Sequence, residues 1–170
     1  MLLTEIPRKV LIVDDHRDAA DAMGMLVEEL GNQVRVTYSG RQAMQAATVF
    51  QPELVLVDLV MPDMDGCSLI AALRKTPAFC NTKIVVITGH KDTAHREMAL
   101  SAGCDDVFVK PVALTQIKSA LASVQTPQSQ PIHQRAQASG FLRRLTVHGA
   151  IVDRLSKSMT PTTMQLRDGF

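Results

Sequence analysis

Residues 10–15 read Val-Leu-Ile-Val-Asp-Asp, so four apolar residues are followed directly by two carboxylates. Two further apolar runs of the same length occur at residues 54–57 (Leu-Val-Leu-Val) and 84–87 (Ile-Val-Val-Ile). Runs of β-branched and leucine residues without polar alternation are typical of strands that are buried on both faces. The three runs therefore predict the centre of a sheet with helices on either side.

Segments with helical spacing of apolar residues separate these runs, and two weaker strands complete the pattern. We expect helices at residues 19–30, 41–50, 66–75, 93–102 and 114–123, and the weaker strands at 33–36 and 106–109. Turn signals agree, because Gly31-Asn32 follows the first helix, Asp65-Gly66 opens the third and Gly103 closes the fourth. Strands that alternate with helices need crossover connections, so residues 1–124 predict a doubly wound parallel α/β domain.

The length and composition fit one ordinary globular domain with additional residues at its C-terminal end. The chain has 170 residues, of which 46% are hydrophobic and 21% charged, and this excludes collagen-like and wholly disordered chains. The formal net charge of +1 combines two unlike parts. Residues 1–127 hold 12 Lys and Arg against 15 Asp and Glu, whereas residues 128–170 hold 6 against 2. No global basic field marks a nucleic-acid-binding protein.

The residues after the domain begin with a polar stretch that is interrupted by prolines, which predicts a linker at 125–137. The C-terminal extension at 138–170 has apolar residues at a 3-4 spacing that permit one amphipathic helix, although a short hairpin also fits. For the role of this extension we consider formation of a homodimer, docking onto a partner, or a disordered extension. It is too short for most DNA-binding modules, so DNA is the weaker expectation.

Neither the N-terminus nor the cysteines suggest an extracellular protein. The first ten residues are charged too early for a secretory signal, and no apolar run approaches the roughly 18 residues of a membrane span. We therefore expect a cytoplasmic protein without membrane contact. Cys67, Cys80 and Cys104 are odd in number and form no Cys-x-x-Cys pair, which predicts reduced, mostly buried thiols without a disulfide or zinc site.

The polar residues at the predicted strand ends carry the chemistry. Asp14, Asp15 and Asp58 follow two strands, Thr88 follows a third, and Lys110 ends the last. Carboxyl ends of parallel strands meet at one crevice, where clustered carboxylates repel each other unless a cation is present. Oxygen ligands favour Mg²⁺, and a lysine and a hydroxyl beside it suit phosphoryl transfer. Helix capping by Asp14 or Asp15 is the simpler alternative, but it explains one position of five.

Four segments together resemble the receiver domain of two-component response regulators. They are residues 10–15, the stretch Asp-Leu-Val-Met-Pro-Asp-Met-Asp-Gly at 58–66, Val-Val-Ile-Thr at 85–88, and Lys110-Pro111. Their order and spacing match that family across residues 8–124. The resemblance implies a flavodoxin-like (βα)5 fold with five parallel strands in the order 2-1-3-4-5.

The same resemblance implies a phosphoacceptor and a metal site. Asp58 is expected to take a phosphoryl group from phosphohistidine on a histidine kinase or a histidine phosphotransfer protein. Asp15, Asp58 and the backbone carbonyl of Val60 are expected to bind Mg²⁺ directly, and Asp14 mainly through metal-bound water. The product, an aspartyl phosphate, would shift the conformation and thereby control a downstream effector, whose identity the sequence leaves open.

The resemblance also assigns the switch residues. Thr88 is the hydroxyl expected to move toward the phosphoryl group, Lys110 pairs with that group, and the peptide bond before Pro111 is expected to be cis. Val107 departs from the family, which commonly has Tyr or Phe three residues before the lysine. Phe108 alternates with Val107 along the strand and should therefore lie in the core on the other face.

A second departure concerns turnover of the phosphorylated state. In this family, the residues two positions after the phosphoacceptor and two after the threonine flank the path of the hydrolytic water. Here they are Val60, which is apolar, and His90, which we interpret as a solvated loop residue. Since Val60 cannot orient a water molecule, we expect a fairly long-lived phosphorylated form.

Two other functions share parts of this pattern. A flavin-binding electron carrier would need a hydroxyl- or glycine-rich phosphate loop after the first strand, where this chain has Asp14-Asp15. A phosphatase with an aspartyl intermediate usually places a second aspartate two residues after the nucleophile, where this chain has Val60. The sequence therefore favours a signalling receiver that is not an enzyme, beyond promoting its own phosphoryl transfer and slow dephosphorylation.

Overall fold

Five parallel strands form one sheet in the order β2-β1-β3-β4-β5. The structure is a computed structural model that describes residues 6–124. Every neighbouring pair of strands in the sheet is parallel. This is the fold and the strand order that the sequence predicted. The strands are β1 (Lys9–Val13), β2 (Gln33–Thr37), β3 (Leu54–Asp58), β4 (Lys83–Thr88) and β5 (Asp106–Val109).

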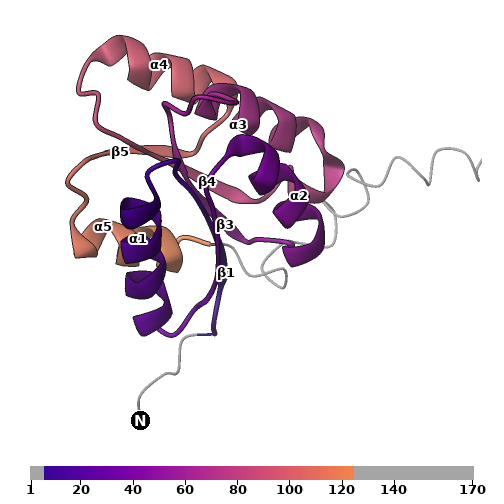
Figure 1. The fold of residues 1–170 in the computed structure, drawn as a ribbon, viewed down its shortest axis with the longest axis vertical. Helices are drawn as coiled ribbons and strands as arrows, with labels where there is room; N and C mark the ends of the chain where they lie inside the picture. The colour runs from indigo at the N-terminus through magenta and orange to yellow at the C-terminus, as the bar shows by residue number, and fades with distance from the viewer. Residues whose placement is uncertain (1–5, 125–170) are drawn as a thin grey trace, which may run out of the picture. The chain divides into compact units, whose positions relative to one another are not determined.

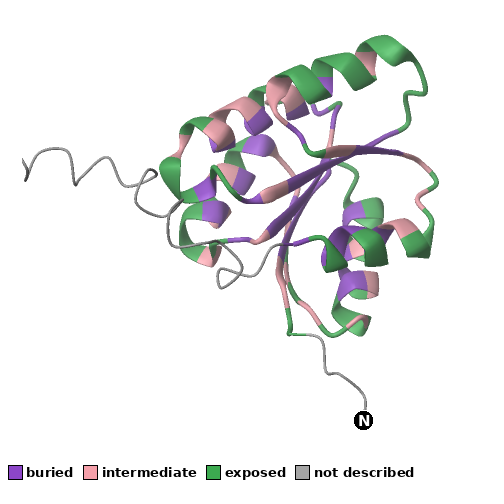
Figure 2. Cartoon of the chain, turned by 180° about the vertical axis from the view of Figure 1, so that it is seen from behind, coloured by how far each residue is buried: buried purple, intermediate pink, exposed green. Residues whose placement is uncertain are grey.

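Helices cover both faces of the sheet, as Figure 1 shows. Two of them, α1 and α5, lie on one face, and α2, α3 and α4 lie on the other. In Figure 2 their buried residues face the sheet and their exposed residues face outward. Their bounds are α1 (Arg17–Glu29), α2 (Gly40–Phe50), α3 (Gly66–Lys75), α4 (Thr93–Ala102) and α5 (Leu114–Ala122), with a short 3-10 helix, η1 (Pro77–Phe79), after α3.

The central strands divide the core into two halves by simple alternation of side chains. In β1, Leu11 and Val13 join the half under α2, α3 and α4, and Val10 and Ile12 join the half under α1 and α5. Successive residues of a strand point to opposite faces, so an unbroken apolar run fills both halves. The strands β3 and β4 do the same, which confirms the prediction of strands buried on both faces.

Residue numbers at the ends of elements differ slightly from the predictions. Helix α1 begins at Arg17, two residues before the predicted start, and η1 was not predicted. Apolar spacing marks the middle of a helix, whereas a polar first turn leaves no such signal. The residues predicted to begin and end helices are confirmed. Asp65 caps α3 by accepting the backbone N–H of Ser68, and Gly103 ends α4 with φ at 105°.

The three cysteines are free thiols, as predicted, but they are not all buried. Cys104 is buried, Cys67 is half-buried and Cys80 is exposed, so the expectation of mostly buried thiols is wrong for Cys80. Burial, helped by the neighbouring Asp105, raises the pKa of the Cys104 thiol to about 11. Cys104 therefore stays protonated at neutral pH and is a poor nucleophile.

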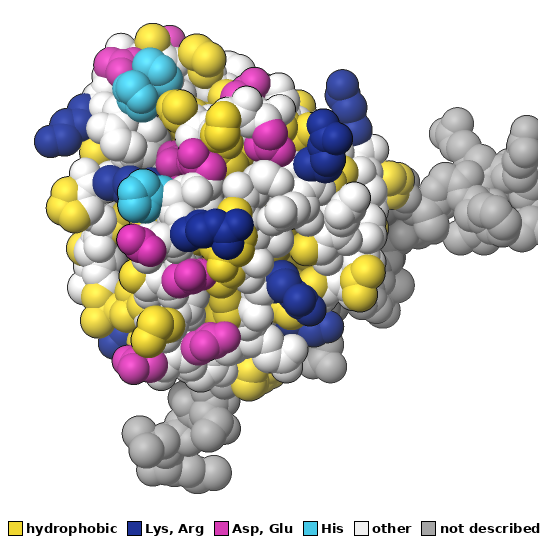
Figure 3. Space-filling view, viewed as in Figure 1, with side chains coloured by type: hydrophobic (Ala, Val, Ile, Leu, Met, Phe, Trp, Pro, Cys, Tyr) yellow, Lys and Arg dark blue, Asp and Glu magenta, His cyan; other side chains and the backbone are white. Residues whose placement is uncertain are grey.

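The predicted linker and C-terminal extension, residues 125–137 and 138–170, lie outside the described residues and stay predictions. Within residues 6–124, no helix combines the length and the apolar character that a membrane crossing requires. The face in Figure 3 carries Lys and Arg side chains interspersed with Asp and Glu side chains. This mixed surface agrees with the near balance of charge in this part of the sequence.

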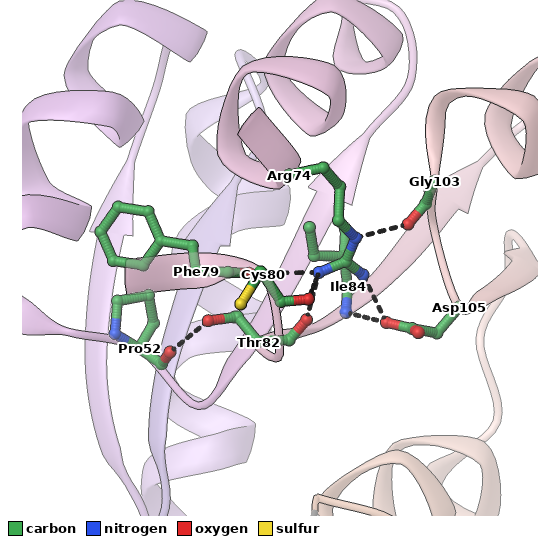
Figure 4. A network of polar contacts seen from close by, with 8 residues as sticks. All are labelled: Pro52, Arg74, Phe79, Cys80, Thr82, Ile84, Gly103 and Asp105. Atoms are coloured by element: carbon green, nitrogen blue, oxygen red, sulfur yellow. Dashed lines mark hydrogen bonds and ion pairs between the residues drawn. The ribbon is translucent and has the colours of Figure 1, made fainter. Parts of the chain in front are cut away.

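Arg74, in the last turn of α3, joins three segments at the end of the sheet opposite the polar strand ends (Figure 4). Its guanidinium donates to the backbone oxygens of Thr82 at 2.6 Å and Gly103 at 2.8 Å, and to the Asp105 carboxylate at 2.8 Å. The same Asp105 oxygen accepts the backbone N–H of Ile84 at 2.6 Å. Arg74 therefore links α3 to the start of β4 and to the α4–β5 connection.

Replacing Arg74 by alanine should destabilise the domain by about 2–3 kcal/mol, because backbone oxygens and a carboxylate lose a charged donor. The measurement is the free energy of unfolding in urea, followed by far-UV circular dichroism. Lys75→Ala is the matched control, since Lys75 is the exposed next residue of the same helix and should change stability by no more than about 0.5 kcal/mol. Equal losses in the two variants would contradict the role of the Arg74 network.

Candidate functional site

Three carboxylates gather at the carboxyl ends of β1 and β3. One oxygen each from Asp14, Asp15 and Asp58 lies within 4.8 Å of the others. The register produces this arrangement, because Val13 pairs with Val57 and the next residue on each strand is an aspartate. Asp14 is 7% exposed, Asp58 is half-buried and Asp15 is exposed, so the cluster opens to solvent on one side. The three carboxylates that the sequence predicted to meet are therefore close together.

Lys110 connects these carboxylates to the end of β5. Its ammonium nitrogen lies 2.8 Å from Asp14 Oδ2 and 3.1 Å from Asp58 Oδ2. Burial lowers the pKa of Lys110, but the hydrogen bonds to Asp14 and Asp58 raise it by more, so the net pKa is above its usual value. The ammonium is therefore charged at neutral pH. It offsets one of the three negative charges and leaves the cluster with an excess of anionic oxygen.

Thr88 lies at the end of β4 but does not hydrogen-bond to this cluster. Its side chain is 1% exposed, and its hydroxyl oxygen accepts the backbone N–H of His90 at 3.1 Å. Its backbone carbonyl accepts the N–H of Lys110 at 2.8 Å. The sequence predicted one cluster that included the hydroxyl, whereas the structure turns the hydroxyl into the β4–α4 loop. A rotation of this side chain would break its bond to His90.

Helix capping does not explain the acidic pair after β1. The N-cap of α1 is His16, whose side chain makes no capping bond. Asp14 Oδ1 instead accepts the backbone N–H of His16 at 2.9 Å, while its other oxygen pairs with Lys110. Asp15 makes no hydrogen bond through its side chain among the described residues. The simpler alternative for Asp14 and Asp15 is therefore wrong, and a charged cluster is the better interpretation.

Contacts with the backbone hold the loop between β3 and α3 close to the end of β3. The N–H of Gly66 donates to the carbonyl of Leu59 at 2.8 Å, and Asp58 Oδ1 accepts the N–H of Leu59 at 2.7 Å. A Cβ atom on residue 66 would collide with the backbone oxygen of Asp58. Val60 follows in the same loop and is 54% exposed.

Asp63 anchors this loop to the start of α2, a role that sequence reasoning missed. Its carboxylate oxygens accept the backbone N–H groups of Gly40 and Arg41, each at 3.4 Å. Desolvation raises the pKa of Asp63, but these hydrogen bonds lower it by more. The signal that could have found it is the helix that begins at residue 40, since free N–H groups at a helix start attract a carboxylate.

The resemblance also singles out Pro111 and Val107. The Lys110-Pro111 peptide bond is cis, as the resemblance implied. Val107 is 7% exposed and packs under α2, α3 and α4, and its carbonyl accepts a hydrogen bond from Arg96 at 3.2 Å. Phe108 packs in the other half of the core, as predicted. A buried aliphatic side chain therefore stands where the family commonly has Tyr or Phe.

Comparisons with known proteins agree with this geometry. The family model described as "Response regulator receiver domain" matches residues 10–122. The receiver domain of a signal transduction histidine kinase from Syntrophus aciditrophicus is 27% identical with a TM-score of 0.64, covering 74% of this chain and 98% of that one. A receiver domain protein from Methanospirillum hungatei is 26% identical with a TM-score of 0.63, covering 69% and 95%.

Two curated relatives are longer proteins. The signal transduction histidine-protein kinase BarA of Escherichia coli K12 is 30% identical over 109 residues, which are 64% of this chain and 12% of the kinase. The DNA-binding response regulator MtrA of Mycobacterium leprae is 33% identical over 104 residues, which are 61% of this chain and 45% of the regulator. The chain thus spans less than half the length of either relative.

Gly66→Ala should destabilise the domain by about 1–3 kcal/mol, because the added Cβ must displace the backbone oxygen of Asp58. Helix propensity alone predicts the opposite sign, since alanine is the better helix former. Gly89→Ala is the matched control, because a Cβ at residue 89 meets nothing within 4 Å. Urea unfolding of both variants measures the difference, and a Gly66→Ala protein as stable as Gly89→Ala would contradict this close packing.

Proposed function

Because the chain belongs to the response regulator receiver domain family, we propose that it accepts a phosphoryl group on Asp58 from phosphohistidine. The observation that carries the proposal is the position of Asp58 between a charged ammonium, 3.1 Å away, and two further carboxylates. An isolated surface aspartate has no such surroundings. Receiver domains are signalling domains, so we propose a switch and not a metabolic enzyme.

Transfer of a phosphoryl group from phosphohistidine to Asp58 needs no further reactant. A carboxylate oxygen of Asp58 forms a bond to phosphorus as the bond from phosphorus to the donor imidazole nitrogen breaks, and the imidazole leaves with that electron pair. Asp58 Oδ1 is held by the N–H of Leu59, and Oδ2 is shared with Lys110. These contacts orient the carboxylate before the donor arrives, which lowers the entropic barrier to transfer. Lys110 can then pair with the oxygens of the transferred group.

A divalent cation suits the remaining oxygens. We propose that Asp15 and Asp58, with the backbone carbonyl of Val60, hold Mg²⁺ and that Asp14 acts through metal-bound water. The donor set fits, because the three side chains offer only oxygen and carry more negative charge than Lys110 offsets. When bound, Mg²⁺ neutralises charge on the phosphoryl oxygens during transfer.

Thr88 and Lys110 are the proposed route from the phosphoryl group to the rest of the domain. The Thr88 hydroxyl would leave the N–H of His90 and donate to a phosphoryl oxygen, which pulls on the β4–α4 loop. Val107 is a buried aliphatic residue at the position where the family commonly has an aromatic ring. We propose that in this chain the change reaches the surface through the loop and α4, and that Val107 follows by small repacking.

The proposed phosphodonor is a histidine kinase or a histidine phosphotransfer protein, and the output acts through a downstream effector. The relatives named above include a histidine kinase and a DNA-binding response regulator, so both ends of such a pathway occur among similar proteins. For residues 125–170 the proposals are self-association into a homodimer, docking onto a partner, or a disordered extension.

The alternatives of similar fold have less support. A mostly apolar pocket of about 250 Å³ adjoins Asp14 and Lys110, and this is below the roughly 300–1,000 Å³ of typical ligand sites. It gives no support to a flavin-binding electron carrier. An aspartyl phosphatase would need an acid-base group two residues after Asp58, where Val60 is apolar and exposed.

Acetyl phosphate with Mg²⁺ should add one phosphoryl group to the wild-type chain and none to Asp58→Asn, because the amide is not a nucleophile. Intact mass spectrometry measures the addition, and EDTA should abolish it. Asp65→Asn is the matched control: it makes the same change in the same loop, and asparagine still caps α3. Equal addition to the wild type and Asp58→Asn would refute the assignment, as would loss of addition only in Asp65→Asn.

Val60→Asn should shorten the lifetime of the phosphorylated chain. A side-chain hydrogen bond to the attacking water, worth about 1 kcal/mol, corresponds to roughly a fivefold faster loss of the phosphoryl group. The measurement is the decay of phosphorylated protein after donor removal. Val60→Ala is the control, since it removes bulk at the same exposed position but supplies no polar group. An unchanged lifetime in Val60→Asn, or an equal change in Val60→Ala, would overturn the explanation.

A further inference from the structure

A second group of potential ligands lies in the β4–α4 loop and the first turn of α4. His90, Asp92 and His95 each offer one ligand atom, and these atoms lie within 4.8 Å of one another. This group shares no residue with the carboxylate cluster of Asp14, Asp15 and Asp58. Figure 3 shows histidine side chains directly beside acidic ones on the face that it displays.

The carboxylate of Asp92 faces both imidazole rings. Nδ1 of His95 lies 2.8 Å from Asp92 Oδ2, and Nδ1 of His90 lies 3.9 Å from the same oxygen. Ligand atoms about 2.0–2.1 Å from a tetrahedral zinc ion are about 3.3 Å apart. The two observed separations lie on either side of this value. The rings are stacked nearly parallel and each lone pair lies in its own ring plane, so one ring must turn before both nitrogens can point to one ion. The side chain of His90 is 48% exposed and has room to turn.

Capping of α4 explains only part of this arrangement. Asp92 is the N-cap and accepts the backbone N–H of His95 at 3.0 Å, which accounts for Asp92 and for the nearby ring of His95. It does not account for His90, whose ring stacks on that of His95 with centroids 4.2 Å apart and an interplanar angle of 14°. Two imidazoles and one carboxylate are thus gathered at a place where helix capping needs only the carboxylate.

The donor types select the class of ion. We propose that His90, Asp92 and His95 form a binding site for a transition-metal ion of the zinc class, with a solvent molecule as the fourth ligand. Imidazole nitrogen favours Zn²⁺ and similar ions, whereas Mg²⁺ prefers oxygen ligands throughout. The side chains are 48%, 49% and 34% exposed, in chain order, which leaves the ion accessible and room for solvent.

The protonation states suit such an ion. Hydrogen bonds from the backbone and side chain of His95 lower the pKa of Asp92, so its carboxylate is charged at neutral pH. A zinc-class ion binds an imidazole through a ring nitrogen that carries no proton, while the other ring nitrogen keeps its N–H.

The site is coupled in space to Thr88. The backbone N–H of His90 donates to Thr88 Oγ1, so an ion that fixes His90 would also hold this hydroxyl away from the phosphoryl group. Linkage would then make ion binding and phosphorylation oppose each other. This consequence rests on the proposed function, whereas uptake of the ion does not, so the two can fail separately.

Zn²⁺ titration of the full chain against a chromophoric chelator, with excess Mg²⁺ to fill the oxygen site, tests the proposal. The wild type should take up one Zn²⁺ more than His90→Gln, His95→Gln and Asp92→Asn, or bind it at least about tenfold more tightly. Asparagine still caps α4, so Asp92→Asn should keep the fold. Co²⁺ should give visible ligand-field bands in the wild type that weaken in these variants.

The control is His16→Gln, which removes an exposed imidazole elsewhere and should leave the uptake unchanged. The readout is the difference between variants, so any ion bound by other residues cancels. Equal Zn²⁺ uptake and affinity in the wild type, His90→Gln and His95→Gln would overturn the proposal. An effect of His16→Gln as large as that of His95→Gln would also overturn it.

Discussion

The parallel register of β1 against β3 is the constraint on which the candidate site depends. Val13 pairs with Val57, and the chain then continues into Asp14 on one strand and Asp58 on the other. A slip of one residue would turn every side chain of the strand to the opposite face, exchanging the two halves of the core. Tight apolar packing on both faces therefore positions the carboxylates, although no carboxylate takes part in that packing.

Three carboxylates and one ammonium meet at this edge of the sheet, so acidic groups outnumber basic ones there. Two unit charges 4 Å apart interact by about 4 kcal/mol at the effective dielectric near a protein surface. Lys110 offsets part of the repulsion between the aspartates by bridging Asp14 and Asp58, because β5 ends beside the same opening. The Arg74 network lies at the other end of the sheet and shares no residue with these charges.

Most of the fold could be predicted because burial on both faces leaves an unambiguous sequence pattern. Runs such as residues 84–87 have no polar position, and glycine or aspartate marks where helices begin or end. Contacts between distant segments were not predictable in the same way. Arg74 reaches Gly103 and Asp105, and Asp63 reaches the start of α2, and neither pairing leaves a local pattern. The exposure of Cys80 likewise depends on where η1 places it.

The sequence alone determined the fold class and the residue types that meet at the carboxyl edge, because these follow from periodicity and from the ends of apolar runs. Its family resemblance implied the strand order. Only the tertiary structure decided how those residues pair. It showed that Lys110 bridges two carboxylates, that the Thr88 hydroxyl bonds to His90, and that His90 stacks on His95. These outcomes depend on side-chain directions across neighbouring loops, and loop geometry is set by packing and not by a repeating pattern.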